Sequence, residues 1–166
     1  MPRNSELPDR RQTSREDAIG EFELAVALSP NSASAHSYLG VALMHADRAT
    51  DAIPHMELAI RLSPSDPEIG AYLTRLAGAY ILAQKFEQSV EWARNAVQRT
   101  NVWNAHAYLC ASLANLARDG DARRARERLE EIQPRIGLDF VRTFYPADKP
   151  QLELVLEGLR RAGLPV

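Results

Sequence analysis

Four histidines and one cysteine are the side chains of this sequence best suited to bind a metal or to act as a base or nucleophile. They are His36, His45, His55, His106 and Cys110. Zinc-binding helices place two histidines at a close spacing such as His-Glu-x-x-His, and no pair in this chain has that spacing. One cysteine also excludes a disulfide framework and a multi-cysteine zinc site. The sequence therefore predicts no metal site, and we expect Cys110 to serve as a small apolar side chain.

The remaining patterns with chemical potential predict no enzyme. The chain has no glycine-rich phosphate loop and no Gly-x-Ser-x-Gly element, and its carboxylates are spread over predicted helix exteriors. Five arginines gather within 118–128, from Arg118 to Arg128, with glutamates three or four residues away. We expect a solvated, ion-paired surface there, and keep contact with nucleic acid as the alternative. We expect no catalytic residues, no cofactor and no metal.

The overall composition indicates one helical domain. The chain has 166 residues, a net charge of −2, and an excess of alanine (25) and leucine (20), which are strong helix formers. The slightly acidic balance counts against a dedicated nucleic-acid binder. No apolar run is long enough to span a membrane, and the first residues lack the apolar core of a signal peptide. These features predict a cytoplasmic protein.

A repeat with a period near 34 residues organises the chain. Ala25 matches Ala59, and Pro30 matches Pro64, each 34 residues later. The copies cover residues 16–32, 50–66, 88–101 and 121–134. Before each of the last three copies stands a second helical pattern, at 36–43, 73–80 and 106–113. Because a period of this length is typical of stacked helix pairs, the sequence predicts an array of such pairs.

The pattern resembles the tetratricopeptide repeat (TPR) family. Each first helix carries a small residue after a leucine, at Gly40, Ala77 and Cys110, as in the family's Leu-Gly-x₂-Tyr pattern. The resemblance implies an all-α, right-handed superhelix. Its predicted parts are a flexible tail at 1–12, a half repeat at 13–32, full repeats at 33–66, 70–102 and 103–134, and capping helices at 135–166.

The resemblance also implies a binding groove on the face formed by the first helices. Carried over position by position, its residues are Ser34, Ser37, Val41, Met44, His45, Thr74, Gly78, Ile81, Leu82, Asn104, Ala107, Tyr108, Ala111 and Asn115. Family members that clamp a peptide carboxylate need charged or amide side chains where this chain has Ser37, Val41 and Thr74. An apolar or helical segment of a partner protein suits this groove better.

The N-terminal half repeat lacks its first helix. Its apolar residues Ile19, Phe22 and Val26 would then have an incomplete cover, which predicts a homodimer through this end.

Three segments are more specific than the general repeat pattern: AIRLSPSDPEIGAYLTRLAGAY, LCASLANLARDGDARRA and LEGLRRAGLPV. They resemble the C-terminal repeat region of bacterial, rhizobial-type class III adenylate/guanylate cyclases, where the last segment is the natural end. None of the cyclase catalytic domain is present. The resemblance implies a non-catalytic interaction scaffold in bacterial signalling. A stand-alone remnant of a cyclase-like regulator, with no partner of its own, is the alternative.

Overall fold

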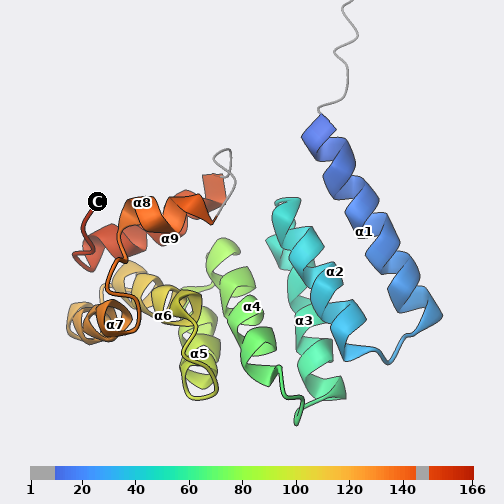
Figure 1. Ribbon diagram of the computed structural model, residues 1–166, viewed down its shortest axis with the longest axis horizontal. Coiled ribbons are helices and arrows are strands. Elements are labelled where there is room, and N and C mark those ends of the chain that lie inside the picture. The colour runs from blue at the N-terminus through green and yellow to red at the C-terminus, as the bar shows by residue number, and fades with distance from the viewer. Residues whose placement is uncertain (1–9, 145–149) are drawn as a thin grey trace, which may run out of the picture.

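The computed structural model describes residues 10–144 and 150–166, and every regular element in them is a helix. The helices are α1 (Arg10–Leu28), α2 (Ala33–His45), α3 (Ala49–Leu62), α4 (Ile69–Leu82), α5 (Phe86–Val97), α6 (Trp103–Asn115), α7 (Asp119–Ile132), α8 (Leu138–Thr143) and α9 (Pro150–Arg161) (Figure 1). The all-α prediction is confirmed. Of the predicted flexible tail, residues 1–9 lie outside the described part, while residues 10–12 already belong to α1.

The helices between α2 and α7 form three hairpins that stack side by side. In each, a first helix (α2, α4 or α6) packs on the second helix that follows it (α3, α5 or α7). The first helices also contact one another in the order α2, α4, α6, so they form one continuous layer. Helix α1 adds to α2 at the open end (Figure 1). This is the half repeat followed by three helix pairs that the repeat predicts.

Small residues allow the two helices of a pair to approach closely. A Cβ atom built on Gly40 of α2 would lie 2.6 Å from Cγ of Met56 in α3. The equivalent Ala77 and Cys110 have no exposed surface, and neither does Ala52 on the facing side of the first pair. The predicted role of these positions is confirmed, because any larger side chain would push the helices apart.

The same three-residue turn closes each hairpin. Asp47, Gln84 and Ala117 all have φ near +60°, the left-handed region. The next residue donates its backbone N–H to a carbonyl five residues earlier, as Arg118 does to Leu113 at 2.9 Å. This pattern is a Schellman cap, which satisfies the last carbonyls of the first helix and reverses the chain. None of the three turns has glycine at the left-handed position.

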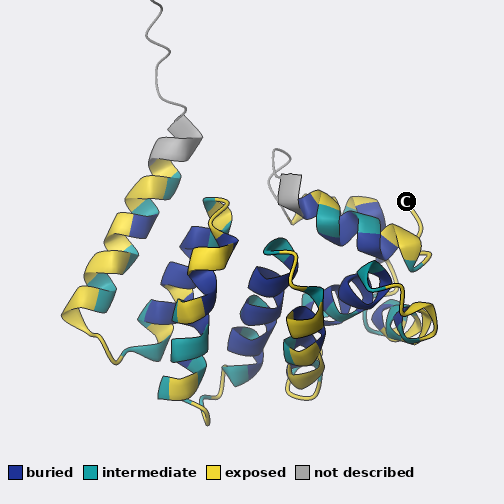
Figure 2. Ribbon diagram, turned by 180° about the vertical axis from the view of Figure 1, so that it is seen from behind, coloured by how far each residue is buried: buried dark blue, intermediate teal, exposed yellow. Residues whose placement is uncertain are grey.

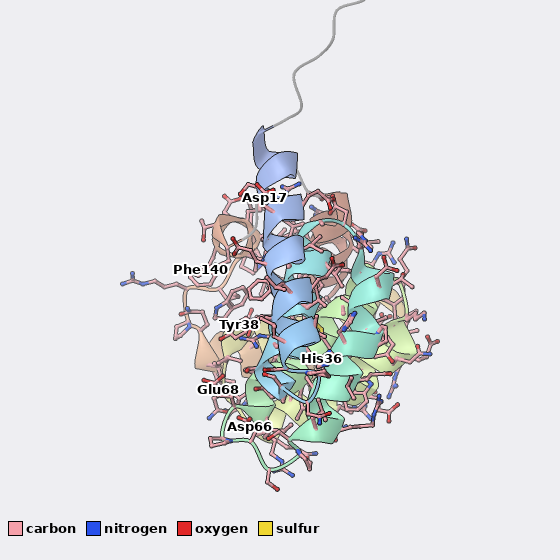
Figure 3. The ribbon with its side chains drawn as sticks, turned by 90° about the vertical axis from the view of Figure 1, so that its right-hand side faces the viewer. Asp17, His36, Tyr38, Asp66, Glu68 and Phe140 are labelled. Atoms are coloured by element: carbon pink, nitrogen blue, oxygen red, sulfur yellow. The ribbon has the colours of Figure 1, made fainter. Side chains whose placement is uncertain are left out.

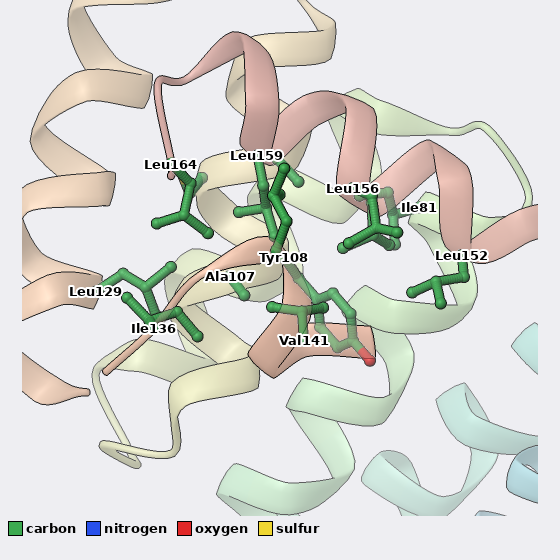
Figure 4. Packing of buried hydrophobic residues seen from close by; sticks show 14 of the residues in the cluster. Ile81, Ala107, Tyr108, Leu129, Ile136, Val141, Leu152, Leu156, Leu159 and Leu164 are labelled. Carbon is green, nitrogen blue, oxygen red and sulfur yellow. The ribbon is translucent and has the colours of Figure 1, made fainter. Parts of the chain in front are cut away.

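The C-terminal helices fold back onto the inner layer of first helices. Helix α9 contacts α6 and α4, and α8 contacts α9. Leu152, Val155, Leu156 and Leu159 of α9 are buried with Ile81 of α4 and with residues of α6 (Figure 4). Figure 2 shows this burial, because the ribbons of α4 and α6 have the dark blue of buried residues along much of their length. Here α9 covers the part of the inner face that α4 and α6 form.

Candidate functional site

A cleft of about 340 Å³ remains open on the inner face beside the C-terminal helices. Three first helices and the residue that follows α8 line it. The lining residues are Val41, Met44, His45, Thr74, Arg75, Leu82, Trp103, Asn104, Tyr108 and Phe144. Most of these side chains are apolar or aromatic, and the volume is at the lower end of ordinary ligand pockets.

An aromatic cluster forms one wall of the cleft. The Trp103 ring centroid lies 5.4 Å from that of Phe140 and 5.0 Å from that of Phe144, and the two phenylalanine centroids are 4.9 Å apart. Edge-on and tilted contacts at these distances are favourable beyond simple burial. Phe144 nevertheless stays 56% exposed. The wall is therefore held in place by the chain and still presents an aromatic surface.

The polar part of the cleft centres on Arg75. Its Nη1 donates to the Ser37 hydroxyl at 2.8 Å, and its guanidinium carbon lies 5.0 Å from the centre of the Tyr38 ring. The neighbouring Thr74 hydroxyl is occupied internally, because it donates to the Gly70 carbonyl at 2.7 Å. Arg75 thus brings a positive charge to a predominantly apolar site.

The structure brings only half of the predicted groove residues together in this cleft. These are Val41, Met44, His45, Thr74, Leu82, Asn104 and Tyr108. Ile81, Ala107 and Ala111 are buried in the same hydrophobic cluster as the apolar face of α9. They cannot contact a partner while α9 is in place.

Of the other four predicted groove residues, three have internal roles and one lies at the exposed start of α2. Gly78 lies under the Tyr108 ring, whose nearest atom would be 3.0 Å from an added Cβ. The Asn115 amide donates to the Leu154 carbonyl of α9 at 3.1 Å. Ser37 is buried beneath Arg75, and Ser34 is exposed at the start of α2, 3.2 Å from the Ser32 hydroxyl. For Gly78, Asn115 and Ser37, partners outside the local repeat decide the role.

Sequence reasoning missed Arg75 and Phe144. Arg75 follows a predicted groove residue, and nothing in the repeat pattern shows that its side chain turns toward the cleft. A signal for Phe144 did exist, since Phe140 and Phe144 are four residues apart and so share a helix face. Trp103, the first residue of α6, also lines the cleft as part of the aromatic wall.

The predicted self-association residues of α1 pack within the chain. Ile19 is 3% exposed, and Phe22 and Val26 are half-buried against the same hydrophobic cluster. The Phe22 ring stacks on Tyr38 of α2, with the centroids 5.8 Å apart. Figure 3 looks onto α1 from this end of the molecule, with Tyr38 labelled. Helix α2 covers the apolar face that a second copy was expected to cover.

Two histidines, one in α2 and one in α3, form a pair within the first helix hairpin. His36 Nδ1 lies 3.1 Å from His55 Nδ1, and His36 Nε2 lies 2.9 Å from the Pro30 carbonyl oxygen. Burial lowers the pKa of His55, and the nearby His36 lowers it further. Within the described residues, no group of three or more His, Cys, Asp or Glu side chains is arranged to hold a metal ion.

Cys110 and the arginine cluster have structural surroundings. Burial raises the pKa of the Cys110 thiol to about 12. Asp121 accepts hydrogen bonds from Arg118, at 2.6 Å, and from Arg124, while Arg128 pairs with Glu131 at 2.6 Å. A depression of about 460 Å³ adjoins this cluster, but alanines form most of its lining. The ion-paired surface expected for 118–128 is what the structure shows.

The fold matches solved TPR proteins. A structure of MamA is similar over 98% of this chain and 94% of its own, with 16% identity and a TM-score of 0.68. YrrB, described as a TPR protein with an unusual peptide-binding site, matches over 90% of this chain and 77% of its own, with 20% identity and a TM-score of 0.63. The MamA RS-1 ArsTM double mutant matches over 74% and 67%, with 20% identity and a TM-score of 0.66.

These similarities establish the fold and nothing finer. No protein-family profile matches the chain, and neither does any curated protein. The predicted TPR-type array is confirmed. In the part of the chain that the structure describes, no helix has both the length and the apolar character needed to cross a membrane.

Proposed function

We propose that this chain is a non-catalytic scaffold that binds a segment of a partner protein in the cleft between α2, α4, α6 and α8. One observation carries the proposal: the cleft is preformed, and large apolar side chains from three helices and from the residue after α8 converge on it. Aromatic residues and methionine are enriched where proteins bind one another, because they offer much contact area at a low cost in ordering.

The rigidity of the cleft supports this role. Trp103 and Phe144 are held by their contacts with Phe140, and Tyr108 packs in the cluster beneath α9. A partner segment would therefore meet a surface that needs little reordering, which favours affinity. The fold contributes as well, since TPR-type arrays are known chiefly as protein-binding scaffolds, and YrrB is described as having a peptide-binding site.

We place this scaffold in bacterial signalling, in the cytoplasm. Support comes from the three sequence segments that resemble the repeat region of class III cyclases. A homodimer through α1 would need Ile19, Phe22 and Val26 to leave α2, or would use the exposed Leu24 and Leu28 instead.

Affinity capture with a matched pair of double variants tests the proposal. Val41→Glu with Met44→Glu puts two charges into the cleft, while Gln88→Glu with Asn95→Glu puts the same two charges on the exposed outer face of α5. We expect the cleft variant to lose partners from a lysate of the source organism that the wild type and the outer-face variant keep. Identical partner lists for all three proteins would overturn the proposal.

A further inference from the structure

Among the described residues that line the cleft, Arg75 is the one Asp, Glu, Lys or Arg side chain. It is half-buried, and among the described residues no carboxylate lies within ion-pairing distance of its guanidinium group. Three other arginines differ in this respect, since Arg118, Arg128 and Arg161 each have a carboxylate partner. The cleft therefore holds a positive charge that the described chain does not neutralise.

The surroundings of Arg75 fix its position and leave its donors largely unused. Ser37 accepts one hydrogen bond, and the Tyr38 and Tyr72 rings lie 5.0 and 6.0 Å from the guanidinium carbon. A guanidinium group has five N–H donors in a planar fork that fits a carboxylate. Because aromatic rings reduce the water around this group, its attraction for an anion is stronger than at an open surface.

The size of the cleft limits what can enter. A volume of about 340 Å³ corresponds to roughly ten water molecules. That is room for one or two large side chains, not for the full width of a helix. A partner would therefore insert side chains while its backbone stays above the cleft.

We propose that the cleft recognises a polypeptide segment in which an acidic side chain stands beside a bulky apolar one. The carboxylate pairs with Arg75, and the apolar side chain packs among Met44, Trp103 and Phe144. This inference rests on the proposed function, since it assigns the chemistry of the partner that the scaffold binds. Charge complementarity selects the acidic residue, because the described residues that line the cleft include Arg75 and no carboxylate.

Peptide selection tests the proposal without knowledge of the natural partner. The probe is a phage-displayed library of random 12-residue peptides, panned against the full chain. We expect the enriched sequences to contain Asp or Glu within a few residues of Leu, Phe or Trp. The best peptide should bind at least tenfold more weakly to Arg75→Gln, and its own acidic residue changed to the amide should cause a similar loss. The two losses should not add, because both remove one interaction.

Further variants separate charge from folding. Arg99→Gln removes an exposed arginine that does not line the cleft, and should bind the peptide as the wild type does. Arg75→Glu should select peptides with Lys or Arg in place of the acid. Loss of binding on changing only the peptide acid needs no protein variant, so it cannot arise from misfolding of the chain.

The outcomes distinguish this inference from the proposed function. Enriched peptides that lack an acidic residue, but no longer bind the Val41→Glu with Met44→Glu variant, would overturn the role of Arg75. They would keep the cleft as a binding site. Peptides that bind that double variant as well as they bind the wild type would overturn both proposals. A library that yields no enriched peptides would do the same. Self-association of the wild type that Arg75→Gln abolishes would make a second copy the occupant, and would also overturn the acidic-segment proposal.

Discussion

At the scale of single residues, the His36–His55 pair joins three parts of the chain. A carbonyl oxygen only accepts, so the contact with Pro30 requires a hydrogen on His36 Nε2. In neutral His36 the Nδ1 atom then accepts, and the donor at 3.1 Å is the Nδ1–H of His55. This assignment connects the loop before α2 with α2 and α3.

The pair predicts a loss of stability in mild acid. Burial, and then His36, lower the pKa of His55 in the folded chain, while Glu23 and Asp51 oppose the shift. The unfolded chain therefore binds more protons once the pH falls below about 6.5, the ordinary histidine value. We expect the free energy of unfolding to be highest above that pH and to fall between pH 6.5 and 5, measured by urea unfolding.

His55→Gln supplies the control for this prediction. It removes the titrating group and should flatten the pH dependence. A smaller slope should remain from His106, whose pKa is also lowered, first by burial and then by Arg128. A wild-type chain equally stable at pH 7.5 and 5 would contradict the prediction.

Gly158 allows α9 to pack closely against the backbone of α6. A Cβ at this position would lie 2.5 Å from the Ala111 carbonyl oxygen and 2.8 Å from its Cα, both backbone atoms. Alanine favours a helix over glycine by about 0.5–1 kcal/mol, whereas overpacking costs about 1–3 kcal/mol. Backbone atoms cannot move out of the way as the end of a flexible side chain can. We therefore expect Gly158→Ala to lower the free energy of unfolding by about 1–2 kcal/mol, measured by urea unfolding. Gly20→Ala, with open space around it, should instead stabilise the chain; the reverse order would contradict this account.

At the scale of elements, the three hairpin turns share one geometry without glycine. A non-glycine residue in the left-handed region costs about 1–2 kcal/mol relative to glycine. Glycine in turn loses more conformational entropy on folding, which offsets part of this difference. Ala117 has no polar side chain to offset that strain, unlike Asp47 and Gln84. The turn between α6 and α7 is therefore the one that glycine would improve most.

We expect Ala117→Gly to stabilise the chain by about 0.5–1 kcal/mol, measured by thermal and urea unfolding. Ala125→Gly, inside α7, makes the same chemical change in a helical residue and should destabilise by a similar amount. If Ala117→Gly were the more destabilising of the two, the left-handed strain would not be what limits this turn.

At the scale of the whole molecule, α9 changes how the array holds together. In a simple repeat array each pair contacts only its neighbours, so stability is a sum of local terms. Here α9 contacts both α6 and α4, and the largest buried cluster draws on α4 to α9. Helices α1 to α3, with part of α4, form a separate cluster. The two halves should therefore differ in how they respond to a change in α9.

Leu156→Ala tests this division. The side chain is fully buried between α9 and the inner layer, and such truncations cost about 2–5 kcal/mol. Hydrogen exchange should show faster opening in α4, α6 and α9, with α2 and α3 little changed. Leu154→Ala, at a half-buried position of the same helix, is the matched control with a smaller effect. Uniform acceleration across all helices would show a single cooperative unit instead.

The sequence alone determined the repeat, the all-helical fold and the small residues at the helix contacts. These features are local or recur at a fixed period: Gly40 faces Met56 within a single hairpin, and the pattern then repeats. Within α2 it also identified Val41, Met44 and His45 as cleft residues, because the face of a first helix follows from its place in the pair.

Only the tertiary structure decided how much of the inner face stays open. The leucine pattern of α9 shows that the helix has an apolar face, but hydrophobic burial has no direction, so the pattern does not say which surface it covers. That choice depends on contacts far apart in the chain, such as Gly158 on Ala111 and Asn115 on Leu154. The same applies to Arg75, because the position of its guanidinium group is set by Ser37 and Tyr38, which belong to another helix.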